Sequence, residues 1–504
     1  TGKGIGHEDL TTPTELLESG NSANIRVSAP GGIKSMQVDI TSSVLTTPME
    51  GSEQNLLEAV KLAPSMELTN PANNDMAAAL AGFGFPTPAQ LLNQQHVYFQ
   101  IMLAMVCAEV TETTNSDFKF TVTDNAGQKT VITLKYVKTV VSPITYNNDA
   151  DLWANTASFT LNIPADATSV SVQYRIKGQT TWNDAESDGS RTAKISPTWT
   201  EGTNDAGLTI YTVDPKTGIF ARKSYEYQLL ADGATVASGE FTPKNNNGDV
   251  IPNAGMESWS TKSMKKMFSG SANVPYPNAV KYEDATGTDK FWDSGNNAYL
   301  TSSGTDKLCT QATYSGKVGN YCAQLAAKYA GIAFAAGNLY TGDFVMDGTV
   351  GYAQFGQPYT YSARPAALKL KYAAEIGEIN RVKNDPPVST GIDKGRIFVC
   401  IVEWSDRHAV KSGTKVDKTT FWDPETVSSL NEGKIIGYGP AYITESHTGS
   451  MKDLALPIVY YEKTDKAPTS KYTLVISTAT SYLGDYLTGC DTNKLWVDDF
   501  KWVY

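Results

Sequence analysis

An alternation of apolar and polar residues with a period of two, the pattern of a half-buried β-strand, recurs along this chain. Near the N-terminus it covers residues 32–40 and again 118–123. The turn-forming sequence Asp-Asn-Ala-Gly at 124–127 follows, and the apolar-rich segment 131–137 then returns as a hairpin partner. These patterns predict a mainly β accessory domain over residues 1–143.

One segment of this first region has helical features instead. Thr87 is a suitable N-cap, Pro88 suits the first helical position, and Gln90 stands three residues after the cap. A helix is therefore expected to begin at Thr87. From His96 to Val106 the periodicity does not choose between helix and strand, and both remain open.

Residues 144–243 contain a second group of strand patterns. The patterned segments are 157–164, 170–176, 211–213, 225–230 and 234–241. The length of this region and its Y-x-Y-x-x-L segment at 225–230 resemble a fibronectin type III or immunoglobulin-like domain. Such domains usually space or present a neighbour, so no catalytic role is expected here.

The polar, turn-rich sequence at 244–249 is typical of a linker, and residues 250–504 are expected to form one large β-sandwich domain. Composition supports an all-β, multi-domain chain. Charged residues make up only 19% of the sequence, below the roughly 25% of globular proteins. Gly, Ser, Thr, Asn and Tyr take their place, and these residues suit short strands joined by tight turns.

Charge and apolar patterning exclude two classes of partner. A net charge of −11 disfavours nucleic acid, whose binding needs clustered Lys and Arg. No apolar run approaches the ~18 residues of a membrane-spanning helix, so no transmembrane segment is expected. The sequence opens at Thr1 without a signal region, so the protein is expected either to be cytoplasmic or to have lost a leader peptide.

The cysteines do not follow the spacing of a metal site. No two of them form a CxxC pair and the His residues are scattered among them, so a zinc site is not expected. Cys309 and Cys322 flank a turn-like stretch at 314–320, and both a cross-hairpin disulfide and two buried thiols fit this arrangement. The cysteines are Cys107, Cys309, Cys322, Cys400 and Cys490.

The large C-terminal region begins with Asn-Ala-Gly-Met-Glu-Ser-Trp at 253–259 and ends with Leu-Trp-Val-Asp-Asp-Phe at 495–500. This pair of motifs resembles jelly-roll carbohydrate-binding modules, whose first and last strands lie close together. With four further segments, the region 250–504 resembles the putative carbohydrate metabolism domain (PCMD) family of Bacteroidetes. These segments are 291–297, 337–342, 363–368 and 483–489.

The PCMD resemblance implies a jelly-roll sandwich and a part in polysaccharide use, with an oligosaccharide or polysaccharide as the ligand. It also implies export to the cell surface, as a lipoprotein tethered to the outer membrane through a Cys upstream of Thr1, beside other surface proteins of glycan use. Residues 1–143 resemble, more loosely, an accessory domain of Bacteroidetes surface lipoproteins. The family brings no established catalytic residues, so none is assigned.

Sugar recognition needs flat apolar faces for the pyranose C–H groups and planar polar groups for the hydroxyls. Both are present at 291–297, a Gly-containing segment. The alternative is that Trp292 is core and the asparagines only turn the chain. For Arg364 the alternative is a structural salt bridge. The predicted ligand-binding residues are Trp292, Asp293, Asn296, Asn297, Asn338, Tyr340, Arg364 and Asp485.

Asp498 shares a face with aromatic residues of the last strand and therefore needs a partner, because burying an unpaired carboxylate is costly. A structural Ca²⁺ ion that is also held by Glu257 of the opening motif is one alternative. Backbone N–H groups of the first strand are the other. No further cofactor is expected.

Hydrolysis of a glycosidic bond needs two carboxylates across a cleft. Glu403 and Asp406 are three positions apart, so on a regular strand they face opposite sides. The E-x-D-x-x-E strand signature of laminarinase-like jelly-roll hydrolases is absent. The sequence therefore favours a surface-exposed carbohydrate-binding protein, with a glycoside hydrolase and a structural adhesin or spacer as alternatives.

Overall fold

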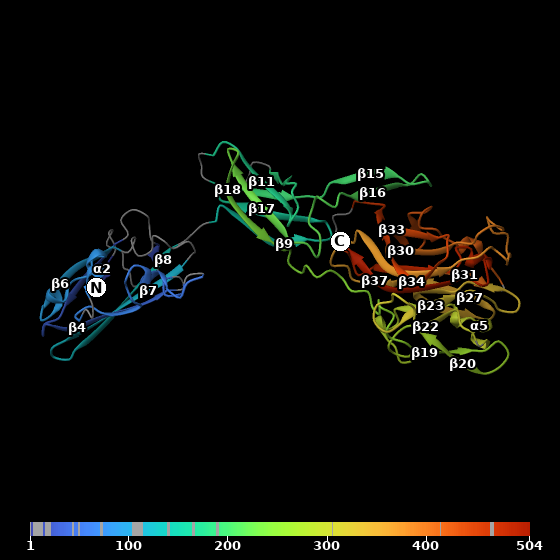
Figure 1. Cartoon of the computed structure of the whole chain (residues 1–504), viewed down its shortest axis with the longest axis horizontal. Coiled ribbons are helices and arrows are strands. Elements are labelled where there is room, and N and C mark those ends of the chain that lie inside the picture. The colour runs from blue at the N-terminus through green and yellow to red at the C-terminus, as the bar shows by residue number, and fades with distance from the viewer. Residues whose placement is uncertain are drawn as a thin grey trace. The chain divides into compact units, whose positions relative to one another are not determined.

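The computed structural model describes residues 2–3, 14–15, 22–42, 45–48, 51–70, 74–102, 114–138, 142–163, 167–187, 191–304, 306–413, 415–463 and 468–504. The chain divides into two compact units, Thr1–Ser142 and Pro143–Tyr504. Both units are built mainly from β-strands joined into several sheets (Figure 1). The prediction of an all-β, multi-domain chain is confirmed.

The first unit has two sheets around a core of its own. Their strand orders are β1-β3-β6 and β2-β8-β7-β4-β5, and β7 and β8 form the predicted hairpin. The strands are β1 (Gly2–Lys3), β2 (Thr14–Glu15), β3 (Ser22–Ser28), β4 (Ile33–Ser42), β5 (Ser65–Glu67), β6 (His96–Met102), β7 (Thr114–Asp124) and β8 (Lys129–Lys138). The helices described in this unit are α1 (Leu56–Ala59), α2 (Asn74–Gly82) and α3 (Pro88–Leu91).

The segment with helical features divides into a helix and a strand. Thr87 precedes α3 in the expected capping box, and its backbone N–H donates to the Gln90 side chain at 2.8 Å. The residues after the helix form β6, which pairs with β3 and alternates between exposed and buried positions. Residues 103–113, with Cys107, lie outside the described residues.

The second unit begins with two four-stranded sheets of order β13-β14-β10-β9 and β12-β11-β17-β18. Phe159, Tyr225 and Phe241 are buried among their aromatic contacts. The fibronectin type III or immunoglobulin-like identity of this sandwich stays a prediction. Its strands are β9 (Ile144–Asp151), β10 (Thr156–Leu161), β11 (Val170–Ile176), β12 (Asn183–Asp184), β13 (Glu186–Ser187), β14 (Thr192–Ile195), β17 (Tyr225–Ala231) and β18 (Ala234–Phe241).

A hairpin of β15 (Trp199–Thr203) and β16 (Thr209–Val213) connects this sandwich to the C-terminal region. β16 pairs with β35 (Val459–Tyr460), so the hairpin extends the largest sheet of that region. The two regions also share one continuous hydrophobic core. They therefore form one compact unit, and the domain boundary between 144–243 and 250–504 stays a prediction.

Arg364 lies at the junction of these two regions. It is buried, and its Nε donates to the Trp153 carbonyl oxygen at 2.6 Å. Its guanidinium carbon lies 4.8, 4.9 and 5.0 Å from the ring centroids of Trp153, Trp199 and Tyr460. The expectation that this arginine is free to bind a sugar is therefore corrected, because its polar atoms and its faces are enclosed by protein.

Substitution of Arg364 with methionine is expected to lower the free energy of unfolding of the second unit by about 2 kcal/mol. The variant loses desolvated cation–π contacts and leaves the Trp153 carbonyl oxygen without this donor. The control is Arg175→Met, whose half-buried guanidinium lies 4.3 Å from the Trp182 ring centroid and pairs with Glu226 at 2.5 Å. These partly exposed contacts are expected to contribute about 0.5–1 kcal/mol. Urea unfolding measures both, and equal losses would contradict a special role for Arg364.

The C-terminal region is a sandwich of two antiparallel sheets (Figure 1). The larger has the order β15-β16-β35-β33-β30-β36-β26-β27-β31, and the smaller has the order β22-β23-β37-β29-β34. Further strands of the larger sheet are β21 (Trp292–Asp293), β26 (Asn338–Asp347), β27 (Val350–Phe355), β28 (Gln357–Pro358), β30 (Gly395–Trp404), β31 (His408–Gly413), β32 (Ser429–Leu430), β33 (Gly433–Ile443) and β36 (Tyr472–Ala479). The smaller sheet contains β22 (Cys309–Ala312), β23 (Cys322–Ala326), β29 (Ala367–Glu375), β34 (His447–Pro457) and β37 (Lys494–Val503).

The opening and closing motifs of this region lie together, since the Phe500 N–H donates to the Ala254 carbonyl oxygen at 3.0 Å.

In the described part of the chain, no helix has the length and apolar character needed to cross a membrane. The remaining short elements are β19 (Ser260–Lys265), β20 (Ser271–Tyr276), β24 (Lys328–Tyr329), β25 (Phe334–Ala335), α5 (Tyr299–Ser303), η1 (Gly287–Asp289), η2 (Gly295–Asn297), η3 (Lys418–Thr420) and η4 (Gly484–Tyr486).

Alternation along β30 gives the larger sheet two apolar faces. Ile397, Val399 and Ile401 point into the core that both sheets share. Phe398 and Cys400 point to the opposite, outer face, where they belong to a separate apolar cluster. A sheet covered on both faces has continuous apolar strands, which explains the unbroken apolar run in β30. The outer face carries the candidate site.

Candidate functional site

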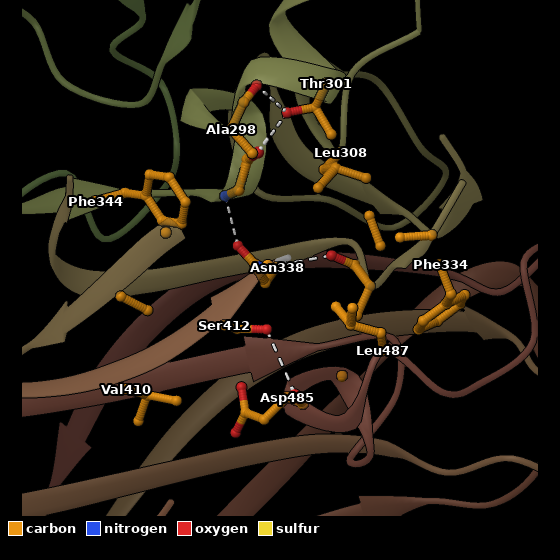
Figure 2. Close-up of a pocket in the computed structure, with 18 of the residues that line it drawn as sticks. Ala298, Thr301, Leu308, Phe334, Asn338, Phe344, Val410, Ser412, Asp485 and Leu487 are labelled. Carbon is orange, nitrogen blue, oxygen red and sulfur yellow. Dashed lines mark hydrogen bonds between the residues drawn. The ribbon is translucent and has the colours of Figure 1, made fainter. Parts of the chain in front are cut away.

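The candidate site is a cavity of about 640 Å³ on the outer face of the larger sheet (Figure 2). Its floor comes from β26, β36 and β30, which are neighbours in that sheet. Residues two apart on a strand point to one face, so two rows of cross-strand partners reach the floor. The rows are Asn338–Ala479–Arg396 and Tyr340–Ser477–Phe398. The volume lies within the roughly 300–1,000 Å³ of small-molecule sites.

Aromatic rings in mutual contact line one side of this cavity. The ring centroids of Tyr340 and Phe355 are 4.9 Å apart, and that of Trp422 lies 6.1 Å from Phe355 and 5.7 Å from Phe398. All four residues line the cavity. Their rings give it a broad apolar surface, of the kind on which the C–H faces of a sugar pack.

Apolar side chains also frame the upper half of the cavity. Figure 2 shows Asn338 between Phe344 on one side and Leu308, Phe334 and Leu487 on the other. Much of the remaining lining is Gly, Ala and Ser. Their small side chains leave the volume open between the larger apolar groups.

Asp485 supplies a carboxylate to this apolar cavity. It lies in η4, and Ser412 Oγ donates to its backbone oxygen at 3.4 Å, so this contact leaves the carboxylate unused (Figure 2). Asp485 is an exposed residue whose side chain lies at the edge of the cavity. Desolvation raises the pKa of the Asp485 carboxyl to about 6, and the nearby Arg396 opposes the rise. The carboxylate can therefore change charge near neutral pH.

Arg396 is the cation of the cavity floor. It forms an ion pair with Asp423 at 2.6 Å, and its guanidinium carbon lies 4.9 Å from the Phe398 ring centroid. Its Nε is buried and has no hydrogen-bond partner among the described residues. The ion pair with Asp423 holds the Arg396 side chain against the aromatic floor.

Phe268 stands at the cavity as an exposed aromatic residue. It lies between β19 and β20 and is 91% exposed, while it also contributes to the cavity lining. An aromatic ring in water beside an apolar cavity is favourably placed to stack on a ligand. The sequence reasoning did not single out this residue.

Residues 267–503 match the family described as the putative carbohydrate metabolism domain, PCMD. The chain contains a PCMD domain. It is a carbohydrate-related β-sandwich protein, and every residue that lines the cavity falls within its PCMD domain. No curated protein was found to match the chain.

Several solved structures resemble the chain at low identity, and three of them follow. A putative glycoside hydrolase from Bacteroides thetaiotaomicron is 17% identical, with 68% of this chain and 98% of that chain covered and a TM-score of 0.34. A putative glycoside hydrolase from Bacteroides vulgatus is 18% identical, with 49% and 96% covered and a TM-score of 0.31. A surface glycan-binding protein from Prevotella bryantii is 10% identical, with 100% and 97% covered and a TM-score of 0.19.

The cavity of the PCMD domain brings together three of the predicted ligand-binding residues. Asn338 and Tyr340 lie on its floor, and Asp485 lies at its edge. Tyr340 is almost fully buried, and burial raises the pKa of its hydroxyl well above the usual value. The ligand-binding role of these three residues stays a prediction.

Trp292 lies in the core behind the cavity, and the expectation of a stacking face is corrected. It belongs to β21 rather than to a loop, and it is 0% exposed. Its ring centroid lies 5.3 Å from that of Phe500, and its Nε1 donates to the Pro252 carbonyl oxygen at 2.7 Å. A ligand has no access to this ring, so the core alternative describes it.

Asp293 supports the cavity wall from behind. It is buried, it pairs with Lys262 at 2.9 Å, and it accepts a hydrogen bond from the Phe344 N–H at 2.9 Å. Burial raises the pKa of the Asp293 carboxyl, and Lys262 opposes the rise. The expectation that Asp293 faces a ligand is therefore corrected, since it positions Phe344 instead.

The two asparagines beside Asp293 are also structural. Asn296 is 0% exposed; it donates to the Cys309 carbonyl oxygen at 2.6 Å and accepts from the Leu308 N–H at 2.8 Å. Asn297 donates to an Asp293 carboxylate oxygen. Their amides are turned into the protein, which corrects their predicted contact with a sugar and agrees with the alternative that they shape the chain.

The two candidate metal ligands hold a hairpin through backbone N–H groups. Glu257 accepts from Asn320 and Tyr321 at 2.8 and 3.1 Å, and Asp498 accepts from Val318 at 2.7 Å. These donors lie between β22 and β23 rather than on the first strand. Burial and the nearby acids raise the pKa of the Asp498 carboxyl to about 6. Among the described residues, no group of three His, Cys, Asp or Glu side chains is placed to hold a metal ion.

The cysteines of the PCMD domain are buried free thiols. In the β22–β23 pair, Cys309 stands opposite Leu325 and Cys322 stands opposite Ala312, so the two cysteines do not face each other. Desolvation raises the pKa of the Cys322 thiol to about 12. The buried-thiol alternative is therefore the one that the structure adopts.

Proposed function

We propose that this protein binds carbohydrate at the cell surface, as part of polysaccharide recognition or use, and that the cavity of its PCMD domain is the binding site. The observation that carries the proposal is the cavity itself, in which contacting aromatic rings meet a carboxylate within a domain of a carbohydrate-related family. Apolar walls with a few polar groups are typical of small-molecule sites.

Hydrolysis receives less support from the same cavity. Glycosidases of the usual kind place two carboxylates on either side of the scissile bond. Among the described residues that line this cavity, Asp485 is the one carboxylate. The raised pKa of its carboxyl is compatible with an acid, but a second carboxylate to serve as base or nucleophile does not line the cavity there.

A glycan array tests the proposal, followed by a reducing-sugar assay on each polysaccharide that binds. We expect saturable binding and no release of reducing ends. The variant Ala479→Phe, which places a ring on the cavity floor, is expected to weaken binding strongly. The matched control is Ala234→Phe at an exposed position of β18, which is expected to bind normally. Equal binding by both variants would place the site elsewhere, and binding to host protein instead of glycan would favour the adhesin alternative.

The affinity for a bound sugar is expected to rise with pH because of Asp485. Its carboxyl pKa is raised to about 6, so the group is mainly neutral at pH 5 and mainly ionised at pH 7. An ionised carboxylate accepts stronger hydrogen bonds from sugar hydroxyls than the neutral acid does. If only the ionised form binds, affinity increases about tenfold between pH 5 and pH 7. Calorimetric titration at the two pH values measures this, and Asp485→Asn should remove the dependence.

A further inference from the structure

The polar side chains that line the cavity are largely engaged within its own walls. Asn338 Oδ1 accepts from the Gly295 N–H at 2.7 Å, and Thr301 Oγ1 donates to the Gly295 carbonyl oxygen at 2.7 Å (Figure 2). Ser481 Oγ donates to the Thr488 carbonyl oxygen at 3.0 Å. These bonds hold the wall segments together and leave few hydrogen-bonding positions for a ligand.

A bare sugar ring does not suit such a lining. Each hydroxyl that enters the cavity without a partner loses its bonds to water and gains nothing in return. Instead, the cavity presents the apolar surface of its aromatic rings, which belong to Tyr340, Phe355, Phe398 and Trp422, with Phe344 beside them. The interior therefore matches an apolar group of about the size of an aromatic ring or a short acyl chain.

The polar groups left for a ligand are few, and they include Asp485, Lys383, Ser477 and Tyr482. The Asp485 carboxylate accepts no hydrogen bond from the described residues, and Arg396 is close enough to influence its charge. Hydroxyl groups that donate to Asp485 would satisfy the carboxylate. The cavity thus combines a small polar set, in which Asp485 is the one carboxylate among the described lining residues, with an apolar interior. This division fits a ligand with two chemically different ends.

We infer that the preferred ligand is a glycan unit that carries an aryl or acyl substituent, with the substituent among the aromatic rings and the sugar hydroxyls at Asp485. The inference rests on the proposed function and names its substrate class. The cavity volume of about 640 Å³ accommodates a monosaccharide with such a substituent, since small-molecule sites span roughly 300–1,000 Å³.

Matched glycosides test this inference. Calorimetric titrations would compare methyl and phenyl β-glycosides of glucose, galactose, mannose and xylose, with benzyl alcohol as the apolar group without a sugar. For each sugar that binds, we expect the phenyl glycoside to bind at least about tenfold more tightly than the methyl glycoside, because its ring is transferred from water to the aromatic wall. Benzyl alcohol alone is expected to bind far more weakly than the phenyl glycoside.

Two variants separate the substituent site from the sugar contact. Ala479→Phe should reduce the preference for the phenyl glycoside to near unity, whereas the control Ala234→Phe should keep it. Asp485→Asn should weaken the binding of both glycosides by a similar factor and leave their ratio unchanged. Thermal unfolding of each variant shows that the fold is retained, and Asp485→Asn keeps the test open if Ala479→Phe does not fold.

The outcomes distinguish this inference from the proposed function. Phenyl and methyl glycosides that bind within about twofold of each other overturn the inference and leave carbohydrate binding in place. Benzyl alcohol that binds as tightly as every phenyl glycoside overturns both, because the sugar then contributes nothing. A protein that binds glycans on the array but none of the phenyl glycosides also overturns the inference.

Discussion

Replacing Lys262 with methionine is expected to lower the free energy of unfolding of the second unit by about 3–5 kcal/mol. Lys262 is buried, and its Nζ lies 2.9 Å from Asp293 and 3.0 Å from Asp343. Methionine fills a similar volume but leaves Asp293 without its cation and Asp343 with the more distant Arg407, at 3.8 Å. Breaking one side of a buried ion pair is costly because the remaining charge stays desolvated.

The control for this variant is an exposed ion pair in the same domain. Lys434 lies 3.4 Å from Glu462, with side chains 63% and 37% exposed. Such pairs contribute about 0–1 kcal/mol, so Lys434→Met is expected to change stability little. Urea unfolding measures both variants. A loss below about 1 kcal/mol for Lys262→Met would show that the buried carboxylates find another partner.

The defect of Lys262→Met should become smaller as the pH falls. Burial raises the pKa of the Asp293 carboxyl, and Lys262 opposes the rise in the wild-type protein. Without the lysine the folded-state pKa rises further above the unfolded value, so protonation stabilises the folded variant more than the folded wild type. The difference in stability is therefore expected to narrow between pH 7 and pH 5. A constant difference would argue against an uncompensated carboxylate.

The same contacts connect stability with the cavity. Asp293 accepts the Phe344 N–H, and Lys262 Nζ donates to the Phe344 carbonyl oxygen at 3.1 Å. Phe344 in turn lines the cavity (Figure 2). The buried ion pair thus fixes one apolar wall of the proposed binding site, although neither of its charged groups reaches the ligand space.

The strands of this protein were predictable because their pattern is local. Alternation in 118–123 and 131–137 predicted the β7–β8 hairpin, and the capping pattern from Thr87 to Gln90 predicted the start of α3. The strand character of β6 was not decided by sequence, since its apolar residues fit both periods. Pairing with β3, about seventy residues away in sequence, settles it, and such long-range pairing is not encoded locally.

The candidate site was harder to predict because burial at 291–297 depends on distant partners. Asp293 pairs with Lys262, and Trp292 donates to Pro252. Neither partner is marked by a local motif, so a segment rich in Gly and Asn was interpreted as a loop. Asn338 and Tyr340 both line the cavity, because residues two apart on a strand point to the same face.

Other cavity residues carry weak or missed sequence signals. Arg396 and Phe398 belong to β30, whose continuous apolar run predicts a strand buried on both faces. The structure shows instead that these two residues line the cavity on the outer face. Phe268 had a usable signal, an aromatic residue within the polar turn Lys-Met-Phe-Ser-Gly at 266–270.

The proposed site can be tested by replacing one aromatic residue with alanine in each of two variants, at Trp292 in the core and at Phe268 beside the cavity. Trp292→Ala is expected to lower the free energy of unfolding by about 3–5 kcal/mol, since it removes a fully buried ring from the core. The Pro252 carbonyl oxygen also loses its donor. At a temperature where the variant remains folded, its affinity for a bound glycan should stay close to that of the wild type.

Phe268→Ala should give the opposite result. The ring is 91% exposed, so its removal is expected to change stability by no more than about 0.5 kcal/mol. If the ring stacks on a bound sugar, glycan affinity should fall by about 1–3 kcal/mol, by analogy with the stacking of bases on aromatic side chains. Thermal midpoint and calorimetric affinity, measured on both variants, separate the two roles. The proposed site is contradicted if Trp292→Ala keeps its thermal midpoint but loses glycan binding, while Phe268→Ala binds glycan as the wild type does. The binding site would then lie at 291–297.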